Sequence, residues 1–405
     1  MIPVPRLLLL ALLVAQISPQ SCSSSGSSSS SSGSGGAVNN VLSVTVNGGP
    51  LSYPNNYPDG LFTAVTICVP NTTTCQTISG ILVDTGSTGL RILDSALTLS
   101  LPQQNAPNGS GSLAECVQYL DGTFTWGPVQ TADIKLAGEA ANAAAIQVIG
   151  ENRVGVPQAC ALGGTANDTV STLGANGILG VGLFREDCGS ACSVTGIQNP
   201  GMYFACPSSA SCAVTTVANA QQLQNPVALF TGSDNNGVLI QLPSVALGGA
   251  ATVTGSMIFG IGTQSNNSLG SATVQTSDGF GNFTTIFGGR SYSESFIDSG
   301  SNGLFFLDTP STGLPTCADY PSFYCPGRTQ QFSATNRGAN GATASVTFNI
   351  GNADQLNGAF NAFQELGGPQ SGSFDWGLPF FFGRNVFVAI EGQSAPGGTP
   401  PYWAY

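Results

Sequence analysis

The stretch "GILVDTGSTGLRIL", residues 80–93, places an aspartate between a short apolar run and a turn of small polar residues. Residues 81–83 are Ile, Leu and Val, which predict a buried strand, and Asp84 follows them directly. A carboxylate at the end of a buried strand is unfavourable unless hydrogen bonds or a partner offset its lost hydration. The role of Asp84 therefore depends on whether the chain carries a second group of the same kind.

The second half of the chain repeats this arrangement. The stretch "ESFIDSGSNGLFFLD", residues 294–308, again has an apolar approach, an aspartate, a small polar turn and an apolar exit. A repeat at about half the chain length indicates two related lobes rather than a solenoid. We expect the first lobe at residues 37–235 and the second at 236–405. If an approximate two-fold axis relates the lobes, Asp84 and Asp298 face each other between them.

Two facing carboxyl groups have a distinctive chemistry. Because they cannot both ionise without strong repulsion, they share one proton. Such a pair can activate a water for attack on a carbonyl carbon while protonating the carbonyl oxygen, so we expect no metal and no cofactor. The neighbouring residues have matching expected roles: hydrogen bonds across the junction from Thr85 and Ser299, close backbone approach at Gly86 and Gly300, and orientation of the outer carboxylate oxygens by Ser87 and Ser301.

The composition predicts the fold class and excludes some catalytic mechanisms. Only 7% of the residues are charged, and 54 glycines and 24 prolines accompany short apolar runs, which predicts an all-β fold. Residues 62–84 and 116–138 both predict β-hairpins, the second with its tip near residues 120–122. The net charge of −12 argues against a nucleic-acid partner. The chain has no histidine, which excludes catalysis by Ser-His-Asp or Cys-His groups.

The N-terminus is typical of an exported protein. Arg6, the apolar residues 7–17, Cys22 and a Ser/Gly-rich stretch at 23–36 together resemble a bacterial lipoprotein. This resemblance implies a signal peptide at 1–22, a lipid on Cys22 and a flexible tether at 23–36. The expected location is the cell envelope, at the outer membrane rather than the inner because Ser23 follows Cys22. Simple secretion, to the periplasm or beyond, is the alternative.

The cysteine count agrees with export. Without Cys22, the 11 cysteines leave an even set of ten, which predicts up to five disulfides in an oxidising compartment. Sequence alone does not define the pairing, although residues 68–75 and 317–325 look like loops closed across their own ends. Zinc binding by these cysteines is the alternative.

These motifs resemble the pepsin-like aspartic peptidases. "VDTGSTGL" and "IDSGSNGL" fit the aspartate signature of that family. "NGILGVGL" (176–183) and "WGLPFFFGRNVFVAI" (376–390) fit the glycine-bounded segments that follow it, and "QYLDGT" (118–123) fits the tip of its flap. The resemblance implies two pseudo-symmetric β lobes with a cleft between them, peptide-bond hydrolysis by Asp84 and Asp298, and a flap tyrosine at Tyr119. It also implies a peptide or protein substrate and a monomer. The chain also resembles a bacterial family known as domain of unknown function 3443.

Two positions depart from the peptidase pattern. Arg91 stands where these enzymes usually have a tryptophan that hydrogen-bonds the flap tyrosine, and Leu120 replaces the usual glycine at the flap tip. We expect Arg91 to be a structural partner for a nearby acid rather than a substrate clamp. The sequence alone also leads us to expect that Arg91→Trp is tolerated.

Three functions compete on these observations. The first is an exported, membrane-anchored aspartic endopeptidase. The second is a catalytically silent binding or inhibitor protein on the pepsin-like fold, and the third is a structural envelope lipoprotein. Both aspartates keep their hydroxyl-bearing neighbours, Thr85 and Ser299, which favours the enzyme. The structural alternative leaves the paired motifs without a reason.

Overall fold

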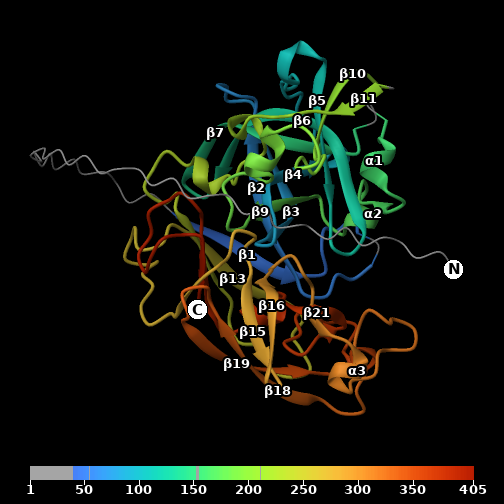
Figure 1. The fold of residues 1–405 in the computed structure, drawn as a ribbon, viewed down its shortest axis with the longest axis vertical. Coiled ribbons are helices and arrows are strands. Elements are labelled where there is room, and N and C mark those ends of the chain that lie inside the picture. The colour runs from blue at the N-terminus through green and yellow to red at the C-terminus, as the bar shows by residue number, and fades with distance from the viewer. Residues whose placement is uncertain (1–39, 54, 152–154, 210) are drawn as a thin grey trace, which may run out of the picture. The chain divides into compact units, whose positions relative to one another are not determined.

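Short strands rich in β-branched and aromatic residues, separated by turns, make up most of the protein, as the composition predicted. The structure, a computed structural model, describes residues 40–53, 55–151, 155–209 and 211–405 (Figure 1). The predicted signal peptide and tether, with Cys22, lie outside the described residues.

The described strands of the first half of the chain are β1 (Val41–Asn47), β2 (Gly60–Cys68), β3 (Cys75–Asp84), β4 (Thr88–Leu93), β5 (Ser112–Gln118), β6 (Thr123–Leu136), β7 (Glu139–Ile149), β8 (Thr165–Ala166), β9 (Gly177–Val181), β10 (Tyr203–Ser208) and β11 (Ser211–Val214). Those of the second half are β12 (Gly237–Gln241), β13 (Val253–Phe259), β14 (Val274–Thr276), β15 (Phe283–Phe287), β16 (Arg290–Ile297), β17 (Leu304–Leu307), β18 (Gln330–Arg337), β19 (Thr343–Ile350), β20 (Gly367–Gly368), β21 (Gln370–Trp376), β22 (Asn385–Ala389) and β23 (Tyr402–Ala404). The α-helices are single turns: α1 (Gln158–Ala161), α2 (Val170–Leu173) and α3 (Thr309–Thr312).

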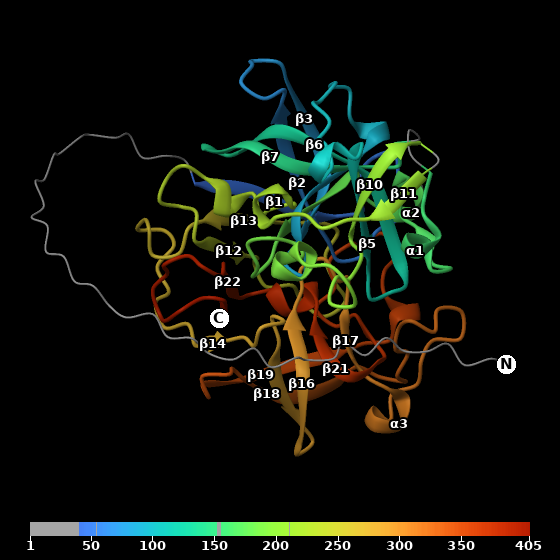
Figure 2. The same ribbon diagram turned by 45° about the horizontal axis from the view of Figure 1, so that its top comes forward.

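The strands form two sheets. The larger has the order β11-β10-β5-β6-β7-β4-β9-β3-β2-β1-β13-β12-β22-β23-β14, with β8 paired to β6, and the smaller has the order β19-β18-β15-β16-β21-β17-β20. Figure 1 shows β2–β7 on one side, β15, β16, β18, β19 and β21 on the other, and β1 beside β13 between them. Figure 2 shows the same division for β2, β3, β5, β6 and β7 against β16, β18, β19 and β21. The first strand of the chain thus pairs with a strand of the second half, because β1 and β13 are antiparallel neighbours.

An internal repeat is visible in the strand pairing. In the first half β9 pairs parallel with β3 and antiparallel with β4. In the second half β21 pairs parallel with β16 and antiparallel with β17. The strand that leads into each signature aspartate therefore lies beside a strand at the glycine-bounded segment that follows: β9 lies within residues 176–183, and β21 ends at Trp376, the first residue of 376–390. This agrees with the repeat seen in the sequence, while the lobe boundary at residues 235 and 236 stays a prediction.

The core is apolar and, in the second half, strongly aromatic. Phe306 stacks on Phe374, which in turn stacks on Trp376, and all three are at most 2% exposed. Phe380 and Phe381 of the "PFFFG" stretch are also buried. These phenylalanines stabilise the fold by removing large apolar surfaces from water, so they do not form a substrate pocket.

Ten cysteines form five disulfides, as the even count predicted. The pairs are Cys68–Cys75, Cys116–Cys160, Cys188–Cys192, Cys206–Cys212 and Cys317–Cys325. The two loops expected to close across their own ends do so. This pairing leaves none of the ten thiols free for zinc, and it indicates a protein of an oxidising compartment, outside the cytosol. Within the described part of the chain, no helix is long and apolar enough to span a bilayer.

The disulfides are directly testable. Alkylation of the denatured but unreduced protein should label none of the ten cysteines, and mass spectrometry after digestion should recover the five linked peptides. Prior reduction provides the positive control, because all ten should then be labelled. Labelling of several of these cysteines without reduction would contradict the pairing.

Candidate active site

The strand pairing brings the two signature turns together. Asp84 is the last residue of β3, and Asp298 directly follows the last residue of β16. The backbone N–H of Asp298 donates to the carbonyl of Trp376 on β21, which extends the parallel ladder by one step (3.1 Å). Each aspartate therefore stands at the end of a paired strand, at the point where the chain turns away from the sheet.

Reciprocal hydrogen bonds join the two turns. The backbone N–H of Thr85 donates to the hydroxyl of Ser299 at 3.1 Å, and the N–H of Ser299 donates to the hydroxyl of Thr85 at 2.9 Å. Each hydroxyl then donates to a carbonyl of the opposite strand, Thr85 to Ile297 and Ser299 to Val83, at 3.2 and 2.8 Å. Both side chains are at most 2% exposed, so solvent does not compete for these bonds. The predicted roles of Thr85 and Ser299 are thus seen in the contacts.

Each aspartate receives the same pair of donors from its own turn. The N–H of Gly86 donates to Asp84 Oδ1 at 2.8 Å and the hydroxyl of Ser87 to Asp84 Oδ2 at 2.5 Å. In the second turn, Gly300 and Ser301 donate to Asp298 at 2.7 Å each. These hydrogen bonds explain how a carboxylate is tolerated at the end of an apolar strand, since they replace the water that it loses on burial.

The two carboxyl groups face each other across the glycines. The N–H of Gly86 donates to Asp298 Oδ1 at 3.1 Å as well as to Asp84 Oδ1, so the two oxygens share one donor. A side chain on Gly86 would place its Cβ 2.7 Å from Asp298 Cγ, and one on Gly300 would place it 2.7 Å from Asp84 Oδ1. Only glycine fits at either position while the carboxyls stay this close.

Electrostatics favour a shared proton. Burial, followed by the charge of Asp84 and then of Asp375, raises the pKa of Asp298 well above its usual value. Asp375 is a third acid beside the pair, and burial raises its pKa to about 8. Asp375 was not predicted from the sequence, because a single aspartate between Phe374 and Trp376 belongs to no recognisable motif.

The predicted flap is a hairpin beside this site. β5 and β6 pair antiparallel, and Tyr119 begins the turn between them, ahead of the exposed Leu120. Tyr119 packs against an apolar cluster that includes Leu82 and Ile178. Burial raises the pKa of Tyr119 to about 12 although the charge of Arg91 opposes the shift, so its hydroxyl keeps its proton.

Arg91 is a structural partner for acids, as expected. Its guanidinium is 1% exposed and donates to Glu115 at 2.6 Å and to Asp187 at 3.0 Å. The hydroxyl of Tyr203 donates to the other oxygen of Asp187 at 2.7 Å. Because Glu115 is on β5, the first strand of the predicted flap hairpin, this buried group connects that hairpin to β4.

A cavity of about 230 Å³ opens beside the aspartate turns. Thr85, Gly86 and Ser87 line it together with apolar side chains from distant segments: Leu120, Leu183, Phe184, Phe280, Phe296 and Trp403. Its apolar wall is suited to an apolar side chain of a ligand held against the two carboxyls.

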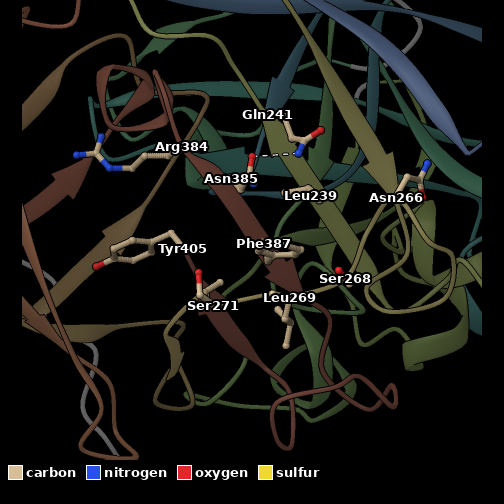
Figure 3. Close-up of a pocket in the computed structure, with 12 residues that line it drawn as sticks. Leu239, Gln241, Asn266, Ser268, Leu269, Ser271, Arg384, Asn385, Phe387 and Tyr405 are labelled. Atoms are coloured by element: carbon tan, nitrogen blue, oxygen red, sulfur yellow. Dashed lines mark hydrogen bonds between the residues drawn. The ribbon is translucent and has the colours of Figure 1, made fainter.

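A second cavity of about 600 Å³ lies over β12 and β22, where Gln241 donates to Asn385 at 3.0 Å (Figure 3). Its lining is mostly polar and includes Arg384 and Tyr405 but neither aspartate.

The comparison with solved structures identifies the class of fold. The structure is similar to the crystal structure of an aspartic proteinase from Irpex lacteus, with 16% identity, a TM-score of 0.50, and coverage of 90% of this chain and 96% of that chain. The protein therefore has the pepsin-like aspartic proteinase fold. It belongs to the family described as "Protein of unknown function (DUF3443)", whose model matches residues 36–405. No curated protein matches the chain.

Proposed function

We propose that the protein is an exported aspartic endopeptidase that hydrolyses peptide bonds with Asp84 and Asp298. The observation that carries this proposal is the hydrogen-bonded junction of Thr85 and Ser299, which holds the carboxyls of Asp84 and Asp298 face to face. One carboxylate takes a proton from a water held between the pair, and the water oxygen attacks the peptide carbonyl. The other carboxyl gives its proton to the carbonyl oxygen. The tetrahedral intermediate then collapses: the first carboxyl passes the proton it took from water to the amide nitrogen, the C–N bond breaks, and the second carboxylate takes back a hydroxyl proton, which releases an acid and an amine.

The surroundings supply a place for the substrate. The apolar cavity beside Gly86 accepts a side chain next to the scissile bond, and Tyr119 and Leu120 cover the peptide from the flap. The substrate is a peptide or protein, and we propose that the enzyme works as a monomer with lobes at 37–235 and 236–405.

The test is cleavage of a general protein substrate by the full chain, with and without a pepstatin-type inhibitor. The proposal predicts cleavage that the inhibitor abolishes. Binding of peptides in a one-to-one complex without any cleavage, over the whole pH range in which the protein is folded, would instead support a binding protein on the same fold.

Truncation of the flap tyrosine tests the placement of the flap. Tyr119→Ala should lower turnover about tenfold to a hundredfold, because closure over the substrate aligns the reacting groups, while the melting temperature changes little. Tyr119→Phe keeps the ring and removes only the hydroxyl, so it separates packing from hydrogen bonding. Full activity of Tyr119→Ala on every cleavable peptide would show that the flap lies elsewhere.

We also propose that a lipid on Cys22 anchors the protein to the cell envelope. Cys22→Ala should shift the protein from the membrane fraction to the soluble periplasmic fraction, and a fatty-acid analogue should label the wild type but not Cys22→Ala. Ser23→Ala serves as the control because it leaves the acceptor cysteine intact. A wild-type protein that is never labelled would exclude the anchor.

A further inference from the structure

The hydrogen bonds of the two aspartates are nearly symmetric, so they do not by themselves decide which carboxyl holds the shared proton. Each aspartate accepts one backbone N–H and one serine hydroxyl from its own turn. The one difference within the turns is that Gly86 also donates to Asp298, at 3.1 Å, and this bond alone favours ionised Asp298. A preference for the proton on Asp298 must therefore come from groups outside the two signature turns.

Strand register identifies one such group. In the first half, Leu82 of β3 and Arg91 of β4 both pair with Ile178 of β9. The corresponding pairs in the second half are Phe296 of β16 and Phe305 of β17 with Asp375 of β21. Asp375 therefore occupies the place that Ile178 has in the first half. A carboxyl group has replaced an aliphatic side chain on one side of the pair only.

The Asp375 side chain faces the site. Paired residues of neighbouring strands share a face of the sheet, and Phe296 on this face lines the cavity beside the aspartate turns. Asp375 is 6% exposed, and its Oδ1 atom makes no hydrogen bond. Hydrogen bonding from Ser301 lowers the pKa of Asp375 against the larger effect of burial, so the serine that donates to Asp298 lies within reach of both acids.

This arrangement puts Asp298 between two acids. Asp84 approaches it across Gly86, and Asp375 approaches it across Ser301. The charge of Asp84 also raises the pKa of Asp375, but Asp298 accepts hydrogen bonds from Gly86 and Ser301, the groups that bring its two acidic neighbours closest. Repulsion from both sides makes Asp298 the last of the three to lose its proton.

We propose that Asp375 is a positioning residue that assigns the shared proton of the pair to Asp298. Asp298 is then the general acid that protonates the carbonyl oxygen, and Asp84 is the general base that takes the proton from water. This assignment rests on the proposed peptidase function, but the location of the proton can be measured without it.

The other titratable groups around the pair do not reverse the assignment. The charges of both aspartates act on Tyr57. Burial, followed by the charge of Asp298, raises the pKa of Tyr57 above its usual range, so its hydroxyl stays neutral. The charge of Asp84 also acts on Tyr119, which burial keeps neutral. The positive charge of Arg91 is already paired with Glu115 and Asp187.

The test compares the full chain with Asp375→Asn, which keeps the shape but cannot ionise. With 13C-labelled aspartate, the Asp298 carboxyl signal, assigned by its loss in Asp298→Asn, should titrate about one pH unit lower in Asp375→Asn than in the wild type. The alkaline limb of kcat/KM should move in the same direction by a similar amount. The control is Asp319→Asn, an exposed acid of the same half, which should leave both unchanged.

The outcomes separate the two proposals. An unchanged Asp298 titration in Asp375→Asn overturns the role of Asp375, even if the protein is an active peptidase. If the wild type cleaves no peptide but the Asp298 signal still shifts, the role of Asp375 stands and the peptidase proposal falls. Asp375→Ile, which restores the residue type of the first half, should shift the signal like Asn. If the Asp298 signal shifts in Asp375→Ile but not in Asp375→Asn, the effect comes from packing and not from charge, and the proposed role of Asp375 is wrong.

Discussion

Replacement of either dyad residue by asparagine should lower turnover by about 10³-fold or more, the loss expected when an acid or base of the reaction is removed. Asparagine keeps an oxygen that accepts the N–H of Gly86 or Gly300, so Asp84→Asn and Asp298→Asn should fold like the wild type. The double variant should be little worse than either single one, because the two carboxyls act as one unit.

The measurement is the rate of cleavage of one peptide by the wild type, both single variants and the double variant, with thermal unfolding followed in parallel. Asp319→Asn is the matched control, since it removes the same charge from an exposed position. Wild-type proteolysis by either single dyad variant would contradict the aspartic mechanism.

Removal of Arg91 should destabilise the protein by about 3–5 kcal/mol, the usual effect of breaking a buried ion pair from one side. Arg91→Met leaves Glu115 and Asp187 buried without their cation. Arg91→Trp should be at least as harmful because it adds a bulky ring to a packed site. The structure thus overturns the sequence-based expectation that tryptophan is tolerated, since that expectation took no account of the two acids.

Urea unfolding at neutral pH measures this effect. Arg185→Met is the matched control because Arg185 is 45% exposed and lies 3.7 Å from Glu186, so its loss should change the unfolding free energy by about 1 kcal/mol or less. Combining Arg91→Met with Glu115→Gln and Asp187→Asn should recover part of the loss. Equal unfolding midpoints for Arg91→Met and the wild type would show that the ion pair does not stabilise the fold.

Local patterns were sufficient to predict the centre of the site. The repeat of an apolar strand, an aspartate and a small polar turn led to the Asp84–Asp298 pair because each turn supplies its own donors within three residues. The flap hairpin and the disulfides Cys68–Cys75 and Cys317–Cys325 are equally local. In each case the residues that interact lie close together in the sequence.

Contacts between distant segments were not predictable from one sequence. Glu115 and Asp187, the partners of Arg91, come from the flap strand and from a loop after β9, and neither stretch has a pattern that marks it. The bond Cys116–Cys160 joins residues 44 positions apart. Asp375 was missed for a different reason: a single acid within β21 has no local signal, and only strand register places it beside Asp298.

The central claim, that two carboxyls share one proton and act on water, is tested most directly by the pH dependence of peptide cleavage. The account predicts a bell-shaped profile of kcat/KM with one acidic and one alkaline limb, because activity requires one protonated and one ionised carboxyl. Burial and neighbouring acids, which raise the pKa of Asp298, should displace the alkaline limb above the range of an isolated aspartate. A rate that rises with pH to a plateau, without an alkaline limb, would contradict the shared proton.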